Sequence, residues 1–468
     1  MAFGLLLAAY FFFFTWEGIR APFAADDMMN LSAHWRHWKQ LFYAPFLLWR
    51  DFYRPMGGWF YVPLFRLFGL HPAPYHAALL LLLLGLVALT YRLARALGAA
   101  PLEAWLAAWI AAYHAGLANL YYETSHIYDV LCAIFYASAL IVWARARSEG
   151  RMLRPGEAAA FLLLELGALN SKEMAVTLPV MLLVYECLWR QPAAPVPPDR
   201  SNFARWLRGP GWLIAASGLL TALAIYGRVL RGLAHEGGYA ATYSLDRWAA
   251  FQRQQFRDIF LQSNDPGWAV LAAVWLLITY LAWRSPRPVL RFCWVFLIIG
   301  PLPVEFLEGR GMAVLAVPFL SWAILAGILA HGLMRAIADA IANDPGLRRL
   351  HPRTRLACVV AVFLLAWGAW NWGIYVRDAR PSMSNTGRPT AAVIRQFELL
   401  APRTRPHTTV VFLNDPFDGW DMAFIAELWF RDPTVTVRLQ KKTPLSPDEL
   451  ARADAVFDWQ SGKLVKVR

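Results

Sequence analysis

Two adjacent acids, Asp26 and Asp27, lie about ten residues beyond the first apolar run of the chain. Only 16% of the 468 residues are charged, and a carboxylate held at a membrane surface loses favourable hydration. A carboxylate beside a hydroxyl can take its proton as a general base. The alternative is a pair of solvated acids in a loop next to a helix end. We interpret the pair as the first candidate for chemistry.

Further acids and bases are expected at the same face of the membrane as this pair. They are Arg54, His76, His114, Glu123, His126, Asp129, Lys172, Glu173, Glu305, Glu308 and Arg310. Such a gathering indicates a reaction site, and Arg and Lys can bind a departing phosphate. This chemistry suits glycosyl transfer from a lipid phosphate. Taken singly, Lys172 and Glu173 can instead pair at a helix start, and His76 and His114 can be hydrogen-bonded helix residues.

The elements that must position these residues are membrane helices. With 58% hydrophobic residues, 23 Trp and only 32 Asp+Glu, a water-soluble fold is excluded. We predict an all-α polytopic membrane protein with about eleven runs that span a hydrocarbon core of about 30 Å. The runs are Ala2–Trp16, Tyr75–Tyr91, Leu102–Asn119, Ile127–Ala146, Gly156–Leu169, Met174–Leu188, Trp212–Tyr226, Trp268–Trp283, Val289–Leu302, Met312–Met334 and Leu356–Tyr375.

Basic residues predict the orientation of these runs. The arginine-rich loops fall on one side if the N-terminus is cytoplasmic; they carry Arg92/Arg95, Arg145/Arg147/Arg151/Arg154, Arg190/Arg200/Arg205/Arg208, Arg284/Arg287/Arg291 and Arg335/Arg348/Arg349/Arg353/Arg355. The net charge of +13 is therefore a topology signal, and nucleic-acid binding is not expected. We expect an integral protein of a bacterial inner (plasma) membrane. The first run lacks a basic start and a small-residue cleavage site, so it is retained as a helix rather than a signal peptide.

Two long loops and a C-terminal region lie on the outer side in this topology. The loops cover residues 17–74 and 229–266, within a transmembrane module of residues 1–376. The first has aromatic, amphipathic segments, His34–Lys39 and Trp49–Arg54, that favour helices in the interface. The second has a helical pattern that includes Arg257. Together these segments are expected to enclose a cavity.

The last part of the chain, residues 377–468, has the composition of a small extracytoplasmic α/β domain. Strands are predicted at Thr408–Asn414 and Thr434–Leu439, helices at Thr390–Leu400 and Ser446–Ala453, and a hairpin around Gly462. A nearby group of acids is interpreted as a solvated turn rather than a metal site; it consists of Asp415, Asp418 and Asp421. The four cysteines, Cys132, Cys187, Cys293 and Cys358, lie in apolar runs or at their ends and are interpreted as reduced packing residues.

Four motifs resemble the transmembrane part of the GT-C superfamily, and within it the TMTC-type and PMT-type protein O-mannosyltransferases. The resemblance covers roughly the first 190 residues and is carried by Asp26-Asp27, Tyr53-Arg54-Pro55-Met56 with Leu70 to Ala77, His114-Ala115-Gly116 with Ser125 to Leu131, and Asn170 to Pro179. A late stretch typical of that family appears only as Glu308 to Pro318, and the tetratricopeptide repeats of TMTC proteins are absent.

This resemblance implies a polyprenyl-phosphate-linked sugar donor and a catalytic base in the first outer loop. By position, Asp26 or Asp27 is the implied base and Glu173 orients Lys172 or the acceptor. The implied donor-phosphate and substrate-binding candidates are Arg54, His76, His126, Asp129, Lys172, Glu173, Arg257 and Arg310. The acceptor, whether protein, lipid or glycan, is left open.

Three further questions are left open by the residues. A divalent cation is possible, because Asp27 with Glu or His partners offers ligands, but no spacing indicates a dedicated metal site. A transporter or flippase of a lipid-linked saccharide would use the same outer charges, although no inverted repeat is visible. A non-catalytic membrane scaffold is the third hypothesis.

Overall fold

The computed structural model describes residues 2–43, 54–189, 206–229, 240–343 and 351–468. Several predicted features fall outside these ranges. They are the segment Trp49–Tyr53, part of the second outer loop (residues 230–239), and Arg190, Arg200, Arg205, Arg348 and Arg349.

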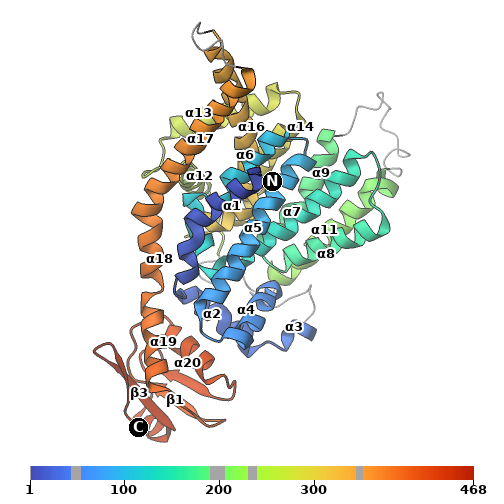
Figure 1. The fold of residues 1–468 in the computed structure, drawn as a ribbon. Coiled ribbons are helices and arrows are strands. Elements are labelled where there is room, and N and C mark those ends of the chain that lie inside the picture. The colour runs from blue at the N-terminus through green and yellow to red at the C-terminus, as the bar shows by residue number, and fades with distance from the viewer. Residues whose placement is uncertain (1, 44–53, 190–205, 230–239, 344–350) are drawn as a thin grey trace.

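Every predicted apolar run contains a helix, and the helices form one bundle (Figure 1). They are α1 (Ala2–Thr15), α5 (Pro72–Ala96), α6 (Pro101–Ala112), α7 (Ile127–Ser148), α8 (Pro155–Leu169), α9 (Leu178–Trp189), α11 (Trp212–Val229), α13 (Trp268–Arg284), α14 (Pro288–Ile299), α16 (Ala316–Ile341) and α17 (Pro352–Ile374). Among the described residues, 7 helical segments are long and apolar enough to cross a membrane by themselves. The predicted fold class is confirmed, and the chain is an integral membrane protein.

Three helices are shorter than the apolar runs that predict them. The helix predicted over Leu102–Asn119 ends at Ala112 and is followed by the 3-10 turn η2 (Ala115–Tyr121). The helix predicted from Met174 begins at Leu178, after the 3-10 turn η4 (Glu173–Thr177). Likewise α14 ends at Ile299, before a Pro-containing turn and α15 (Leu302–Glu305). Hydropathy detects apolar side chains and does not detect such changes of backbone geometry.

The centre of the bundle is α16, which packs against α6, α7, α14 and α17. Close approach depends on small residues, as is usual between membrane helices. A Cβ added to Gly327 of α16 would lie 2.7 Å from both the Ala107 nitrogen and the Glu103 carbonyl oxygen of α6. Cys132 and Cys293 are buried among these helices, and all four cysteines are free.

The described residues of the predicted first outer loop form helices at one end of the bundle (Figure 1). After the turn η1 (Trp16–Arg20), the described part of this loop contains α2 (Ala25–Arg36), α3 (Gln40–Tyr43) and α4 (Pro55–Phe68). Pro55 occupies the first turn of α4, where a missing N–H is tolerated. The predicted helix of the second loop is α12 (Leu245–Ile259), whose first turn is capped by the Ser244 hydroxyl.

The helix α17 continues through the π turn η9 (Tyr375–Ala379) into α18 (Arg380–Thr386) and α19 (Arg388–Leu400). Figure 1 shows this rod running along the bundle to a small sheet beyond α2. The sheet has the order β2-β1-β3-β4, with β1 parallel to β2 and β3. Its strands are β1 (Thr409–Phe412), β2 (Thr436–Leu439), β3 (Ala455–Gln460) and β4 (Lys463–Lys466), and its other helices are α20 (Asp421–Phe430) and α21 (Pro447–Arg452).

Candidate active site

Asp27 is in the first turn of α2 and is fully buried. Its Oδ2 accepts a hydrogen bond of 2.7 Å from the Ala24 N–H, which satisfies a free donor at the helix start. Its Oδ1 accepts a hydrogen bond of 2.6 Å from the Ser125 N–H, 98 residues away in the chain. Burial raises the pKa of Asp27 to about 7, although the hydrogen bonds from Ala24, Thr124 and Ser125 oppose this shift. Asp27 therefore joins α2 to the 3-10 turn η3 (Thr124–His126).

Asp26 has a different environment, although it is the neighbouring residue. Its side chain is exposed. Burial is the main reason that the pKa of Asp421, at the start of α20, is raised, and the negative charge of Asp26 adds to this shift. Asp26 therefore lies toward the C-terminal region, and Asp27 lies toward the bundle. Of the two acids, only Asp27 is held by a hydrogen bond to the turn that carries His126.

Cationic side chains gather beside η3. The Lys172 Nζ lies 3.0 Å from the Asp129 Oδ2, and the Arg54 guanidinium lies 2.7 Å from the Glu173 Oε1. The His126 Nδ1 lies 3.8 Å from the Asp129 Oδ2, and its Nε2 lies 3.4 Å from the Glu123 Oε2. The structure thus brings together five of the predicted site residues from α4, α7 and the turn before α9.

These cations are partly accessible, whereas one of their carboxylate partners is not. The exposed fraction of the side chain is 14% for Lys172 and 1% for Asp129. Burial opposes the charge of Arg54, but the neighbouring Glu173 carboxylate outweighs it and raises the pKa of Arg54 above its ordinary value. Arg54 is therefore charged, and both Arg54 and Lys172 are held in place by an acid before any ligand arrives.

Tyr128 links the helix α2 to Arg54 and was missed as a site residue by the sequence reasoning. Its hydroxyl donates to the Asn30 Oδ1 at 3.1 Å and lies 2.8 Å from the Nε2 of His34. The Arg54 guanidinium lies over its ring, 5.4 Å from the centroid. Burial, followed by the nearby Arg54 charge, lowers the pKa of His34 to about 4, so its imidazole is neutral.

Two glycines in α4 allow this arrangement. A Cβ added to Gly57 would lie 2.0 Å from the Tyr128 Cε1, and one added to Gly58 would lie 2.9 Å from the His34 Nδ1. Only a residue without a side chain leaves room for both rings. The adjacent Gly57 and Gly58, directly after the predicted Arg54-Pro55 motif, are the sequence signal that was available for this contact.

The second outer segment contributes a neighbouring wall. On α12, the Gln252 Nε2 donates to the Glu305 Oε1 at 2.6 Å, and both side chains are buried. The helix α15, which ends at Glu305, packs against η4, which begins at Glu173. The segment α12, from the predicted second outer loop, therefore lies near η4 through α15; the predicted enclosure of a cavity by both outer loops stays a prediction.

Three predicted site residues lie elsewhere. His76 is buried on α5, with its ring centroid 6.4 Å from that of Phe23. Arg257 forms ion pairs with Asp258 at 3.0 Å and Asp265 at 2.9 Å, on the outer part of α12. An expected position on the same side of the membrane is not enough to bring side chains to one point, because the rotation of each helix decides where its side chains lie.

Arg310, the third of these residues, lies beside α12 rather than on η3. Its carbonyl oxygen accepts a hydrogen bond of 2.8 Å from the Gln254 Nε2. This main-chain contact does not test the role predicted for the Arg310 side chain at the donor phosphate, which stays a prediction.

A divalent cation does not fit the clustered acids. Both oxygens of Asp27 accept N–H groups, and Asp129 and Glu173 face Lys172 and Arg54. In the described part of the chain, no group of three or more His, Cys, Asp or Glu residues is arranged to hold a metal. We therefore assign no step to a metal ion.

The arrangement provides a carboxyl with a pKa near neutrality, Asp27, bound to the turn that carries His126. Two further basic side chains, Arg54 and Lys172, belong to the adjoining cluster of ion pairs. Such a carboxyl can exchange a proton at physiological pH, and Arg54, Lys172 and His126 can stabilise an anion that forms near them. This combination suits transfer of a group from a phosphate.

Comparison of the whole chain with solved structures finds similar folds. ArnT from Cupriavidus metallidurans, bound to undecaprenyl phosphate, matches with a TM-score of 0.56 and 14% identity over 99% of this chain and 97% of ArnT. AglB, an oligosaccharyltransferase from Archaeoglobus fulgidus in complex with an inhibitory peptide and a dolichol-phosphate, matches with a TM-score of 0.52 and 12% identity. That match covers 98% of this chain and 69% of AglB.

The apo form of the A. fulgidus oligosaccharyltransferase matches with a TM-score of 0.51 and 14% identity, over 93% of this chain and 64% of the archaeal protein. The chain thus spans about two thirds of that protein's length. No protein-family model and no curated protein matches the sequence. At 12–14% identity these matches establish the fold of the chain and not its activity.

Proposed function

We propose, from the GT-C fold that this chain has, that it is a membrane glycosyltransferase that moves a sugar from a polyprenyl-phosphate donor to an acceptor hydroxyl on the extracytoplasmic side. One observation carries the proposal. Arg54, Lys172 and His126 gather around Asp129 and Glu173, and His126 directly follows Ser125, whose N–H binds the Asp27 carboxylate. ArnT and AglB, the neighbours in fold, are seen with undecaprenyl phosphate and dolichol-phosphate, respectively.

In the proposed step, Asp27 acts as the general base. The acceptor O–H gives its proton to the Asp27 carboxylate, and the acceptor oxygen forms a bond to the anomeric carbon of the sugar. The bond from that carbon to the phosphate oxygen breaks, and its electron pair leaves with the lipid phosphate. A leaving group of this kind gains negative charge, which Arg54 and Lys172 stabilise.

The burial of Asp27 adds a requirement to this step. In the structure, the Ala24 and Ser125 N–H groups cover its oxygens, so an acceptor reaches the carboxyl only when the contact to Ser125 opens. The contact joins α2 to η3, and both segments lie outside the packed centre of the bundle. A bound acceptor hydroxyl can replace the Ser125 N–H as the hydrogen-bond donor to Oδ1.

The test compares Asp27→Asn with Asp26→Asn in purified protein supplied with labelled polyprenyl-phosphate sugars. Loss of a general base lowers a rate by about 10²-fold to 10⁴-fold, and we expect that loss of sugar transfer only in Asp27→Asn. The exposed Asp26 should be replaceable with little effect. Retained transfer in the double variant Asp26→Asn/Asp27→Asn would exclude the mechanism.

A transporter of a lipid-linked saccharide is separated by the same variants. Lipid movement between leaflets needs no proton acceptor, so Asp27→Asn should leave it unchanged while donor hydrolysis and transfer are lost.

The proposed topology places α2, α4 and residues 377–468 outside the cytoplasm. We further propose that the C-terminal domain helps to bind the acceptor, because α20 packs directly on α2.

A further inference from the structure

The end of the bundle opposite the candidate active site contains a cavity of about 570 Å³ lined by three arginines. Arg92 and Arg95 are three residues apart on α5, so their side chains leave the same face of the helix. Arg145 reaches the cavity from the last turn of α7. Ser148 and Trp189 complete its polar and aromatic lining.

These arginines differ from others at the same end of the bundle, which are neutralised by acids. The neutralised pairs are Arg147 with Glu186, Arg151 with Glu157, and Arg287 with Glu103. Across the ranges that the structure covers, Arg92 and Arg145 have no ion pair, and the Arg95 side chain donates only to the Ala99 carbonyl at 2.6 Å. Like charges that converge without an acid leave a strong positive potential in a cavity.

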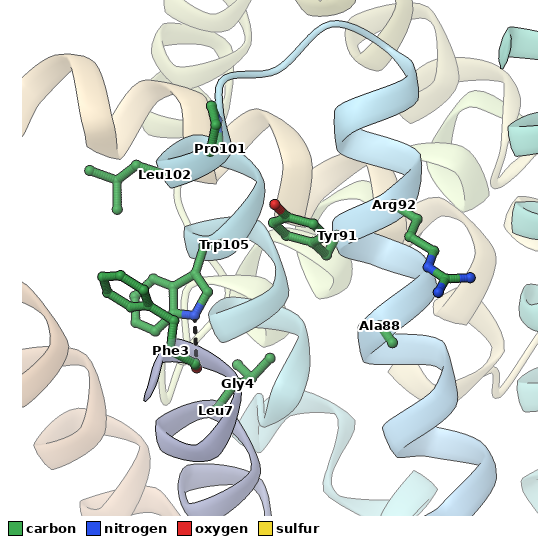
Figure 2. Close-up of a pocket in the computed structure, with 9 residues that line it drawn as sticks. All are labelled: Phe3, Gly4, Leu7, Ala88, Tyr91, Arg92, Pro101, Leu102 and Trp105. Carbon is green, nitrogen blue, oxygen red and sulfur yellow. Dashed lines mark hydrogen bonds between the residues drawn. The ribbon is translucent and has the colours of Figure 1, made fainter. Parts of the chain in front are cut away.

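A second cavity of about 570 Å³ adjoins the first and shares Tyr91 and Arg92 with it. Its other lining residues are almost all apolar: Phe3, Gly4, Leu7, Ala88, Pro101, Leu102 and Trp105. Figure 2 shows Tyr91 on the side of α5 that faces Trp105, while the Arg92 guanidinium extends to the other side of the same helix. Two residues of one helix turn thus separate an apolar groove from a basic cavity.

We propose that the two cavities together bind one anionic phospholipid of the adjacent leaflet. Its phosphate would contact Arg92, Arg95 and Arg145, and one acyl chain would lie in the groove between α1, α5 and α6. Arginines of membrane proteins are enriched on the cytoplasmic side, which explains why these three lie at the same end of the bundle. That tendency does not explain why they converge beside an apolar groove. Basic cavities between membrane helices are suited to lipid phosphates.

The test compares how strongly the protein retains phosphatidylglycerol and phosphatidylcholine from nanodiscs. Native mass spectrometry detects the retained lipid, and titration with each lipid measures its affinity. Near an anionic lipid each basic residue changes affinity about five-fold, so the variant Arg92→Gln/Arg95→Gln/Arg145→Gln should bind phosphatidylglycerol roughly 100-fold more weakly. The control, Arg284→Gln/Arg335→Gln/Arg353→Gln, removes the same charge from exposed positions outside both cavities. Equal retention in the two triple variants would overturn the proposal.

A second variant separates a lipid from a soluble phosphate. Ala88 is exposed and lines the groove, so Ala88→Trp fills it without any change of charge. We expect at least ten-fold weaker retention of phosphatidylglycerol in this variant, and unchanged, weak binding of glycerol 1-phosphate. If Ala88→Trp retains the lipid as the wild type does, the site accepts only a phosphate and the lipid assignment is wrong. Neither readout depends on sugar transfer, so the result is independent of the proposed function.

Discussion

Asp27 sets the pH dependence expected of the proposed transfer. Burial raises its pKa to about 7, and a general base acts only when it is deprotonated. We predict that kcat/KM for sugar transfer rises about ten-fold per pH unit below pH 7 and becomes constant above it. Measurements between pH 5 and pH 9 with a fixed labelled donor check this prediction. A profile that is flat from pH 5 to pH 7 would contradict the role of Asp27.

The same carboxyl predicts how stability depends on pH. Below about pH 4 it is protonated in both the folded and the unfolded chain, since its ordinary pKa is 3.8. Between about pH 4 and pH 7 the unfolded chain releases this proton while the folded chain retains it, so rising pH lowers stability across that window. Thermal unfolding in detergent should show a smaller difference between pH 5 and pH 8 in Asp27→Asn than in wild type. Asp26→Asn is the control and should keep the wild-type difference.

Lys172 is predicted to stabilise the fold as well as to bind phosphate. Lys172→Met removes the nearer basic partner of the buried Asp129, at 3.0 Å, and leaves His126 at 3.8 Å. Removal of one partner from a buried ion pair costs about 3–5 kcal/mol, which denaturant unfolding can measure. The double variant Lys172→Met/Asp129→Asn should recover most of this stability but not sugar transfer. Recovery of both would mean that Lys172 has only a structural role.

At the scale of elements, the approach of α4 to α7 depends on Gly57. A Cβ there would lie 2.0 Å from the Tyr128 Cε1, so Gly57→Ala must displace the ring or the helix. We expect a loss of about 1–3 kcal/mol in stability and a marked loss of transfer, because Tyr128 contacts Arg54. Gly85→Ala on α5 is the matched control, since nothing lies within 4 Å of its added Cβ. Similar effects of the two substitutions would show that Tyr128 is not held by this contact.

At the scale of the whole molecule, α20 docks the C-terminal region onto α2. The two oxygens of Glu427 accept hydrogen bonds from the Ser32 hydroxyl at 2.7 Å and from the Arg36 guanidinium at 2.6 Å. Exposed ion pairs contribute about 0–1 kcal/mol, so Glu427→Ala should leave global stability nearly unchanged. It should instead speed hydrogen exchange in residues 25–36, measured by mass spectrometry.

The control for this docking contact is Glu398→Ala on α19, an exposed acid on the same C-terminal unit. It should leave exchange in α2 at the wild-type rate. If Glu427→Ala also leaves this exchange rate unchanged, contacts other than those of Glu427 hold the C-terminal region on α2. The cation over an aromatic ring formed by Arg431 and Phe65, at 5.2 Å, is then the next contact to remove.

The sequence by itself determined most of the elements, because they depend on local patterns. Apolar runs long enough to cross a membrane predicted the helices of the bundle, and Gly462 marked the hairpin of β3 and β4. Several helices were missed, among them α4 and α20, and the start of α20 at Asp421 was interpreted as a solvated turn. Residue type also identified Arg54, His126, Asp129, Lys172 and Glu173 as candidates, because few charges occur in a chain of this composition.

Only the tertiary structure decided which of these candidates meet. Asp26 and Asp27 are identical in type, but successive residues of a helix point about 100° apart, so one faces the C-terminal region and the other binds the Ser125 N–H. The convergence of Arg92 and Arg145 across α5 and α7 depends in the same way on helix packing. Hydrophobic periodicity specifies which residues are apolar, whereas the rotation and depth of each helix are fixed by contacts between residues far apart in the chain.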